Sequence, residues 1–382
     1  MKIYRLSDKN SNKKLLKELN VQGAGVSIMA KKMQLYFFKI TDISPFALNI
    51  LKQDALSIGA ELAVPSGVIK CEQEFYDAIL IANKKQIEIL SKKELAQPFG
   101  LKDLAKELKR YITIKQYSTK IMGVINANSD SFFDKSRFQN QLAVEKCLEM
   151  IEDGANIIDI GGVSSRPNAE IIDDEEELNR VKPICDMVQS QELYKKATFS
   201  IDSYSPKVIE YALNCGFTII NDITGAKNIK IIELAVKYGV KLSIMHMQGN
   251  PQNMQDNPTY SDVVVEISEF FDTQIRKCED VGLTRDDIIL DVGIGFGKTL
   301  NHNLALIKNL SEFNKFGCEV LIGASRKSMI DMIIPTPIEE RLSGTIAIHL
   351  EAINNGANII RCHDVKEHKQ AIEVNRAIKD YC

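Results

Sequence analysis

GANIIDIGG, residues 154–162, joins a glycine to a short apolar run that ends in polar residues, and this arrangement recurs four more times. The other four stretches are GFTIIND (216–222), GVKLSIMHM (239–247), GCEVLIGAS (317–325) and GANIIRCHD (356–364). A glycine just past a helix can adopt the left-handed conformation that ends the helix. A run of four or five apolar residues is typical of a strand buried on both faces. Each stretch therefore predicts a helix followed by a buried strand.

Three further apolar runs lack the glycine but share the polar ending: IMGVINANSD (121–130), ATFSIDS (197–203) and DDIILDVG (286–293). Together the runs predict eight buried strands, with enough residues between them for a helical return. Eight parallel strands with intervening helices form a closed barrel, whose chemistry lies at the carboxyl ends of the strands. The predicted fold class is therefore α/β, a (β/α)8 TIM barrel preceded by a small N-terminal α/β domain.

The N-terminal domain is expected because a bare barrel needs about 250 residues, whereas the chain has 382. Residues 1–113 contain two predicted strands, MQLYFFKI (33–40) and AILIA (78–82), and a predicted helix, SPFALNILKQDALSIG (44–59). We predict a small α/β extension of unknown role over 1–113 and the catalytic barrel over 114–382. The amphipathic helix GLKDLAKELKRY (100–111) would lead into the barrel.

The composition is that of an ordinary globular protein, with 45% hydrophobic and 26% charged residues. A net charge of −3 gives no general attraction to nucleic acid. The eight cysteines form no C-x-x-C pair, which argues against a zinc site or a disulfide framework. The N-terminus lacks an apolar segment, and no run reaches the ~18 apolar residues of a membrane span. We expect a cytoplasmic protein that binds neither nucleic acid nor membrane.

The predicted strand ends carry two kinds of polar group. Cationic donors for an anion are Arg166, Lys298, Arg326, Lys327, Arg361 and His363. Acceptors for a ligand with several N–H groups are Asp202, Asn221 and Asp291. A cationic side and a carboxylate side on one rim predict a substrate with a phosphate-like group at one end and an amino-heterocycle at the other.

Seven motifs occur in order, one per strand end: MGVINANSDSF, IIDIGGVSSRP, IINDITG, MHMQGNPQNMQ, ILDVGIGFGK, GASRKS and IIRCHDV. Together they closely resemble dihydropteroate synthase, a pterin-binding TIM-barrel enzyme, over roughly residues 118–382. The resemblance implies a transferase of folate biosynthesis that condenses (7,8-dihydropterin-6-yl)methyl diphosphate with 4-aminobenzoate. The products would be 7,8-dihydropteroate and diphosphate, and Mg²⁺ would assist. It also implies a homodimer that sulfonamides inhibit.

The resemblance also assigns site residues by matching position. Asn126 would meet the metal and the diphosphate, with Arg361 and His363 on the diphosphate. Ser165 and Arg166 would lie on a loop near the diphosphate and the amine. The pterin would be bound by Asp202, Asn221, Asp291, Lys298 and Lys327, packed by Met245 and Phe296, and the aminobenzoate carboxylate would lie near Ser325.

Several positions depart from the family's usual residues. Asn128 and Ser129 stand where Thr-Pro is common, and Lys135 and Ser136 where Gly-Gly is frequent. Val163 replaces a usual Glu, Ser165 a usual Thr, Val292 a usual Pro and Cys362 a usual Val. The departures at 128–136 and 163–165 lie on two loops. How these two loops close over a ligand is therefore not predicted. None of the departures removes a charged or hydrogen-bonding residue from the expected pterin or diphosphate contacts.

Some polar residues have a structural interpretation. We expect His246 to be a satisfied core histidine, and Asp222 and Asp364 to brace loops. Asp159 is equally compatible with structural support and with substrate contact. GIGFGK (293–298) is not a nucleotide P-loop, because the position of its first glycine, residue 292, is Val.

Two other functions remain in competition. A pterin-dependent methyltransferase shares the barrel and the pterin pocket, but does not need the loops NANSDSFFD and VSSRP or the GASRKS corner. A non-catalytic pterin-binding barrel is the third possibility. Diphosphate release that depends on 4-aminobenzoate would separate the three.

Overall fold

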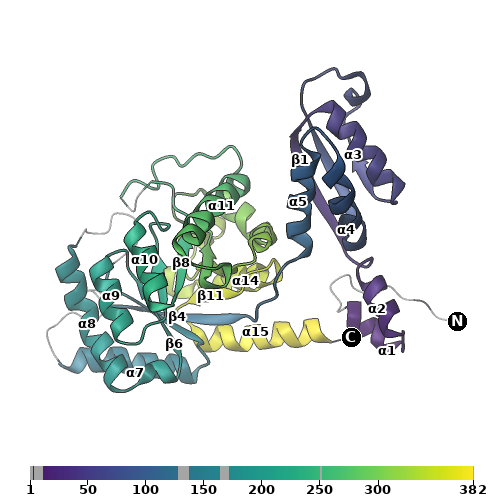
Figure 1. Ribbon diagram of the computed structural model, residues 1–382. Coiled ribbons are helices and arrows are strands. Elements are labelled where there is room, and N and C mark those ends of the chain that lie inside the picture. The colour runs from purple at the N-terminus through teal and green to yellow at the C-terminus, as the bar shows by residue number, and fades with distance from the viewer. Residues whose placement is uncertain (1–2, 4–11, 128–136, 164–171, 250–251, 382) are drawn as a thin grey trace. The chain divides into compact units, whose positions relative to one another are not determined.

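The computed structural model describes residues 3, 12–127, 137–163, 172–249 and 252–381 (Figure 1). The chain divides into two compact units. One comprises Met1–Ile114 with Val374–Cys382, and the other Lys115–Glu373. The division falls one residue beyond the expected end of the N-terminal domain, and the last residues of the chain group with that domain.

The first unit is built on a three-stranded antiparallel sheet in the order β1-β3-β2. Its strands are β1 (Leu35–Ile43), β2 (Glu61–Ala63) and β3 (Tyr76–Asn83), and its helices are α1 (Asn12–Glu18), α2 (Gly23–Ala30), α3 (Pro45–Ser57), α4 (Lys84–Lys93) and α5 (Leu101–Ile112). Alternate residues of β3 are buried, as expected for a strand with one face on a core. Ser44 caps α3, and its side chain accepts a hydrogen bond from the Ala47 amide. The strand β2 and the helices α1, α2 and α4 are additions to the predicted elements.

The second unit is a closed barrel of eight parallel strands, as predicted. The strands follow one another in chain order, and β11 pairs with β4 to close the barrel. They are β4 (Lys120–Asn126), β5 (Ile157–Gly161), β6 (Thr198–Asp202), β7 (Ile219–Asp222), β8 (Lys241–Met245), β9 (Ile288–Asp291), β10 (Glu319–Ile322) and β11 (Ile359–Cys362).

A helix follows each barrel strand, and each except the last, α15, leads the chain back to the start of the next strand (Figure 1). These helices are α7 (Arg137–Glu152), α8 (Asp174–Ser190), α9 (Pro206–Asn214), α10 (Ile229–Tyr238), α11 (Val263–Val281), α12 (Leu300–Lys308), α13 (Ser328–Ile333), α14 (Leu342–Asn354) and α15 (Val365–Asp380), with the 3₁₀ segment η5 (Leu310–Phe316) after α12. Ser205 caps α9 and Asp173 caps α8, each accepting from a backbone N–H of the first turn. The acidic run after Asp173 therefore lies at a helix N-terminus, where negative charge is favourable.

The interior of the barrel is apolar below the site. Six side chains form a cluster of their own inside the strands: Met122, Ile157, Ile219, Ile289, Leu321 and Ile359. Successive side chains of a strand point to opposite faces, so a residue two positions later faces the interior again. Two residues beyond the four isoleucines come Asp159, Asn221, Asp291 and Arg361. The strand periodicity therefore brings these four polar side chains together above the apolar cluster.

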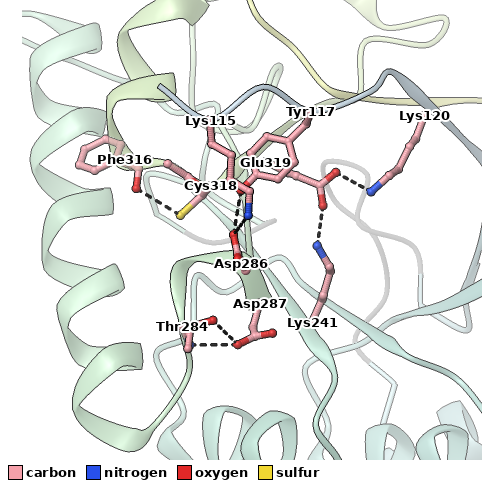
Figure 2. Close-up of polar contacts among 11 residues, drawn as sticks. Lys115, Tyr117, Lys120, Lys241, Thr284, Asp286, Asp287, Phe316, Cys318 and Glu319 are labelled. Carbon is pink, nitrogen blue, oxygen red and sulfur yellow. Dashed lines mark hydrogen bonds and ion pairs between the residues drawn. The ribbon is translucent and has the colours of Figure 1, made fainter. Parts of the chain in front are cut away.

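Charged side chains close the other end of the barrel (Figure 2). Glu319, at the start of β10, is 1% exposed. Its Oε1 lies 2.6 Å from the ammonium of Lys120, and its Oε2 lies 2.6 Å from the ammonium of Lys241. Lys115 pairs with Asp286, and the Tyr117 hydroxyl donates to the Gly317 carbonyl at 2.7 Å. The charged and polar groups at this end pair with one another, so we expect a ligand at the opposite end, where the carboxyl ends of the strands lie.

Candidate active site

Arg361 occupies the centre of the polar layer at the carboxyl ends of the strands. Its Nε donates to Asp159 Oδ2 and its Nη2 to Asp202 Oδ2, both at 2.7 Å. Asn221 Nδ2 also donates to Asp159 Oδ2, at 3.2 Å. Asp159 is fully buried, and its one oxygen orients both Arg361 and Asn221. The structure therefore gives Asp159 the supporting role, one of the two interpretations left open by the sequence.

Several buried polar atoms near this layer have no hydrogen-bond partner among the described residues. They are Asp159 Oδ1, Asn221 Oδ1, Ser200 Oγ and Ser243 Oγ. A buried polar atom without a partner costs about 1–3 kcal/mol, so ordered water or a ligand is needed to satisfy it. Two of these atoms are carbonyl-type acceptors and two are hydroxyl oxygens, a combination that suits a ligand with several N–H groups.

Asp291, at the end of β9, shares this opening with a tight glycine loop. The Gly293 amide donates to Asp291 Oδ1 at 2.8 Å. Gly293 has a φ of +67°, and a Cβ there would lie 2.0 Å from the His246 carbonyl oxygen. Glycine is therefore required for the backbone to pass this close to the loop after β8.

Lys327 and Phe296 face each other beside Asp291. The ammonium of Lys327 lies 4.4 Å above the centroid of the Phe296 ring and donates to the Ile294 carbonyl oxygen. Burial lowers the pKa of Lys327 to about 8. An aromatic face from the loop after β9 and a donor from the loop after β10 can hold a flat heterocycle, which is the role that the sequence assigned to both residues.

Lys298 is 3% exposed and contacts protein groups. Its ammonium donates to the carbonyl oxygens of His246 and Phe296, at 3.1 and 2.9 Å, and lies 3.1 Å from His246 Nδ1. Burial lowers the pKa of His246 to about 3, so the imidazole is neutral and accepts from the lysine. His246 packs against Phe270, with ring centroids 5.0 Å apart, and is half-buried, so its hydrogen-bonding is satisfied as predicted but it lies at the edge of the core. In these contacts Lys298 joins the loops after β8 and β9, and its role as a pterin contact stays a prediction.

The loops after β10 and β11 are tied to each other at the rim. Ser325 Oγ lies 2.9 Å from His363 Nδ1 and accepts from the His363 amide at 3.3 Å. Arg326 forms two hydrogen bonds with the carboxylate of Asp364, at 3.1 and 2.5 Å. Asp222 likewise braces its own loop by accepting from the amides of Thr224 and Ala226. The bracing roles predicted for Asp222 and Asp364 are therefore seen.

Burial also shifts the two carboxyls predicted to meet the pterin. It raises the pKa of Asp202, against the opposing effect of the Arg361 guanidinium. Burial raises the pKa of Asp291 too, although the hydrogen bond from Gly293 works against this shift. One guanidinium shared by Asp159 and Asp202 leaves the carboxylate side short of positive charge, which favours a ligand that brings N–H donors.

The remaining predicted residues lie around this mouth or outside the described part of the chain. Asn126 ends β4 and is half-buried, and Met245 ends β8 and is buried. Ser165 and Arg166 fall outside the described residues, as do the departures at Asn128, Ser129, Lys135 and Ser136. Val292 and Cys362 are buried, so these two departures are accommodated in the core.

Sequence analysis missed Glu177, Ser200 and Ser243. Glu177 on α8 is buried, burial raises its pKa to about 7, and its Cγ would lie 3.1 Å from a Cβ at Gly162. Glu177 is the last residue of the acidic run 173–177, and nothing in that run marks this one carboxyl as buried. The two serines could have been found, because they precede Asp202 and Met245 by two residues and so share their face of the strand.

A divalent metal has few protein ligands to choose from here. No group of three or more His, Cys, Asp or Glu side chains suited to a metal occurs in the described ranges. Mg²⁺ is often bound through one or two protein oxygens, with water and substrate phosphates completing its shell. The side-chain oxygen of Asn126 fits that pattern. Separately, no described helix is both long and apolar enough to cross a membrane.

The sequence profile of the pterin-binding enzymes matches residues 122–363, which span the barrel from β4 to the loop after β11. This match covers more than half of the chain and takes in the barrel strands, except for the first two residues of β4. The chain belongs to the family of pterin-binding enzymes.

Individual relatives show which group of pterin-binding enzymes the chain is similar to. The bifunctional dihydropteroate synthase/dihydropteroate reductase of Helicobacter pylori is 41% identical over 369 residues, which are 96% of this chain and 97% of the relative. Two solved dihydropteroate synthases, from Yersinia pestis with a sulfonamide drug complex and from Clostridium difficile in the presence of pteroic acid, both superpose with a TM-score of 0.64 and 36% identity. They cover 69% and 70% of this chain, and 95% and 100% of their own. The chain is therefore a member of the dihydropteroate synthases, which are transferases of folate biosynthesis.

Proposed function

We propose that this mouth binds (7,8-dihydropterin-6-yl)methyl diphosphate and 4-aminobenzoate and joins them to 7,8-dihydropteroate. The observation that carries the proposal is the position of Arg361 between Asp159 and Asp202, which puts carboxylate acceptors and cationic donors into one opening. The Clostridium difficile relative with pteroic acid supports it. Purified protein with Mg²⁺ should release diphosphate only when both substrates are present. No release under these conditions would refute the proposal.

The two ends of the substrate meet different parts of the mouth. Asp202, Asn221 and Asp291 would accept the N–H groups of the pterin, while Lys327 would donate to it and Met245 and Phe296 would pack its faces. Ser325 would lie near the carboxylate of 4-aminobenzoate. Ser165 and Arg166 would approach the diphosphate and the amine from the loop after β5.

The reaction breaks the bond between the pterin methylene carbon and the diphosphate oxygen and forms a bond from that carbon to the amine nitrogen. Arg361 and His363 would stabilise the negative charge that gathers on the leaving diphosphate. A bound Mg²⁺ neutralises diphosphate charge, and Asn126 would hold it. The amine loses one proton after attack, so no strong base is required of the protein.

Four exposed apolar side chains support a homodimer. Met332, Ile333, Ile334 and Ile338 are between 52% and 63% exposed within one short segment that begins in α13. Burying such a group in a second copy of the chain would remove it from water. Light scattering should give twice the mass of one chain, and an Ile333→Asp, Ile334→Asp variant should give the mass of one. We also propose that the enzyme is cytoplasmic, where folate-pathway substrates are made.

Reduction of dihydropteroate is a second candidate function of the whole chain. It is favoured by the Helicobacter pylori relative, whose name includes a reductase and whose match extends through the N-terminal unit. The two solved relatives named above cover 69% and 70% of this chain. Purified protein given dihydropteroate and a reduced nicotinamide, with and without added flavin, should then form tetrahydropteroate. Unchanged dihydropteroate in both mixtures would rule this activity out.

A further inference from the structure

Two buried histidines lie behind the loops that follow β10 and β11. His349 is on α14 and His368 is on α15, and each is 1% exposed. Their ring centroids are 5.0 Å apart, and His349 Nδ1 lies 2.8 Å from His368 Nε2. Neither side chain belongs to the binding mouth described above, so the pair needs an explanation of its own.

The hydrogen bonds of the pair fix its proton positions. The Ala324 amide donates to His349 Nε2 at 3.1 Å, so the proton of neutral His349 is on Nδ1 and is donated to His368 Nε2. The proton of His368 is then on Nδ1, which lies 2.6 Å from the Asp364 carbonyl oxygen. Burial lowers the pKa of both histidines, which favours these neutral forms. Three hydrogen bonds thus run from the backbone at Ala324 to the backbone at Asp364.

The two ends of this chain of hydrogen bonds adjoin residues of the anion-binding side. Ala324 immediately precedes Ser325, and Asp364 immediately follows His363. The backbone after Ser325 is strained, because Arg326 has a left-handed φ of 55°. Thr345, also on α14, accepts from the Arg326 amide at 2.9 Å. The helix that carries His349 therefore holds the loop after β10 at two successive points.

We propose that His349 and His368 form a positioning pair that fixes the loops after β10 and β11 relative to each other, so that Ser325 and His363 face the anionic groups of the substrates. This inference rests on the proposed function for the identity of those groups. The pair acts through the backbone of Ala324 and Asp364 and touches no reacting atom. The pterin acceptors are on β6, β7 and β9. Lys327 is the pterin residue on the loop after β10, and its ammonium is held from the loop after β9 by the Ile294 carbonyl oxygen. Loss of the pair should therefore weaken anion binding far more than pterin binding.

Two separate titrations of one variant test this. His349→Leu fills a similar volume but can neither accept from Ala324 nor donate to His368. Calorimetry with inorganic diphosphate and Mg²⁺ should show about tenfold weaker binding, the effect of losing one or two net hydrogen bonds. Calorimetry with 6-hydroxymethyl-7,8-dihydropterin, which lacks the diphosphate, should show a change of no more than about twofold. His368→Leu should behave in the same way, and the double variant should be no worse than either single variant, because both break one chain of hydrogen bonds.

Phe313→Leu is the matched control, since it removes buried volume from η5, where Phe313 packs against Phe271. It should lower the melting temperature and leave both affinities unchanged. Equal weakening of both ligands in His349→Leu, or unchanged diphosphate binding, would overturn the proposal. If His349→Leu does not fold, His349→Gln, which can still accept from Ala324 but breaks the contact with His368, is judged by the same two titrations. Wild-type protein that binds both ligands but releases no diphosphate in the assay would refute the proposed reaction and not the positioning pair.

Discussion

Arg361 Nη2 lies 2.7 Å from Asp202 Oδ2, so two residues that the sequence assigned to opposite ends of the substrate are directly paired. Asp202 was expected to meet the pterin and Arg361 the diphosphate. The pair places the boundary between the two ends of the substrate at the centre of the barrel mouth. It also keeps the Asp202 carboxylate compensated when no ligand is bound, because a buried charge without a partner is costly.

Removing either member of this pair should abolish turnover without unfolding the barrel. Arg361→Ala removes a donor to the diphosphate and leaves two carboxylates without their cation, and Asp202→Ala removes a pterin acceptor. Losing one positioned charge-stabilising group commonly costs about 3 kcal/mol, or about two orders of magnitude in rate. Steady-state kinetics and circular dichroism measure rate and fold separately. A normal rate in either variant would show that the site is assigned wrongly.

Sulfonamides should inhibit competitively with 4-aminobenzoate, because they present an aromatic amine opposite an anionic group of similar shape. The Yersinia pestis relative with a sulfonamide drug complex supports this expectation. Raising the inhibitor concentration should raise the apparent KM for 4-aminobenzoate and leave kcat unchanged. If no sulfonamide competes, the closure of the loops around Asn128 and Ser165 differs from that of the family.

Much of the barrel could be predicted because its signals are local. A short apolar run marks each strand, a glycine after a helix precedes five of them, and all eight strands lie where these patterns put them. In the N-terminal unit the three-residue strand β2 was missed, since a strand this short carries no periodicity. The helix α4 has a capping box at Asn83 and Gln86, a signal that was present and was overlooked.

The meeting of these polar residues at the barrel mouth was predictable, whereas their pairings were not. Polar residues at strand ends identify Asp202, Asn221, Asp291 and Arg361. Which carboxylate Arg361 meets depends on the stagger of strands 159 to 202 residues apart, and no local pattern encodes that. The contact between His349 and His368 depends in the same way on how two separate helices pack.

The catalytic rate should fall in acid through loss of pterin binding. Burial raises the pKa of Asp202 to about 7, and the pterin N–H groups need the ionised carboxylate. We therefore expect kcat/KM for the pterin diphosphate to fall as the pH drops below about 7.

The contribution of Asp202 to folding stability changes with pH in the opposite direction, because the folded protein binds this proton more tightly than the unfolded chain does. The stabilisation is present below the unfolded value of 3.8 and is lost as the pH rises through about 7. Asp202→Asn should flatten the pH profiles of kcat/KM and of the free energy of unfolding. If kcat/KM of the variant still falls in acid as in the wild type, the titrating group is not Asp202.

Removing the metal should stop turnover and leave the pterin pocket intact. Mg²⁺ would be held mainly by diphosphate oxygens and water, with Asn126 as a protein ligand. A chelator should therefore abolish diphosphate release, while calorimetry still detects 6-hydroxymethyl-7,8-dihydropterin. Asn126→Ala should raise the Mg²⁺ concentration needed for half-maximal rate. Full activity in the presence of excess chelator would exclude a metal-assisted reaction.

Glu319 should matter for stability and not for catalysis, because it is the first residue of β10 and the site lies at the carboxyl ends of the strands. Its carboxylate is buried between Lys120 and Lys241, whose side chains are 32% and 33% exposed. Glu319→Gln leaves two neighbouring cations without their anion, at a cost of about 2 kcal/mol, below the usual figure for a buried pair because water reaches both lysines. Burial would raise the pKa of Glu319, but the hydrogen bonds and charges of the two lysines outweigh burial and lower it. The stabilisation by this ion-pair cluster is therefore present above the unfolded pKa of 4.5 and is lost as the pH falls through the lower pKa of the folded protein. Chemical denaturation at neutral and acid pH measures this. The wild-type and Glu319→Gln proteins should differ at pH 7 and converge in acid, and a variant that loses activity while keeping its stability would contradict the purely structural role.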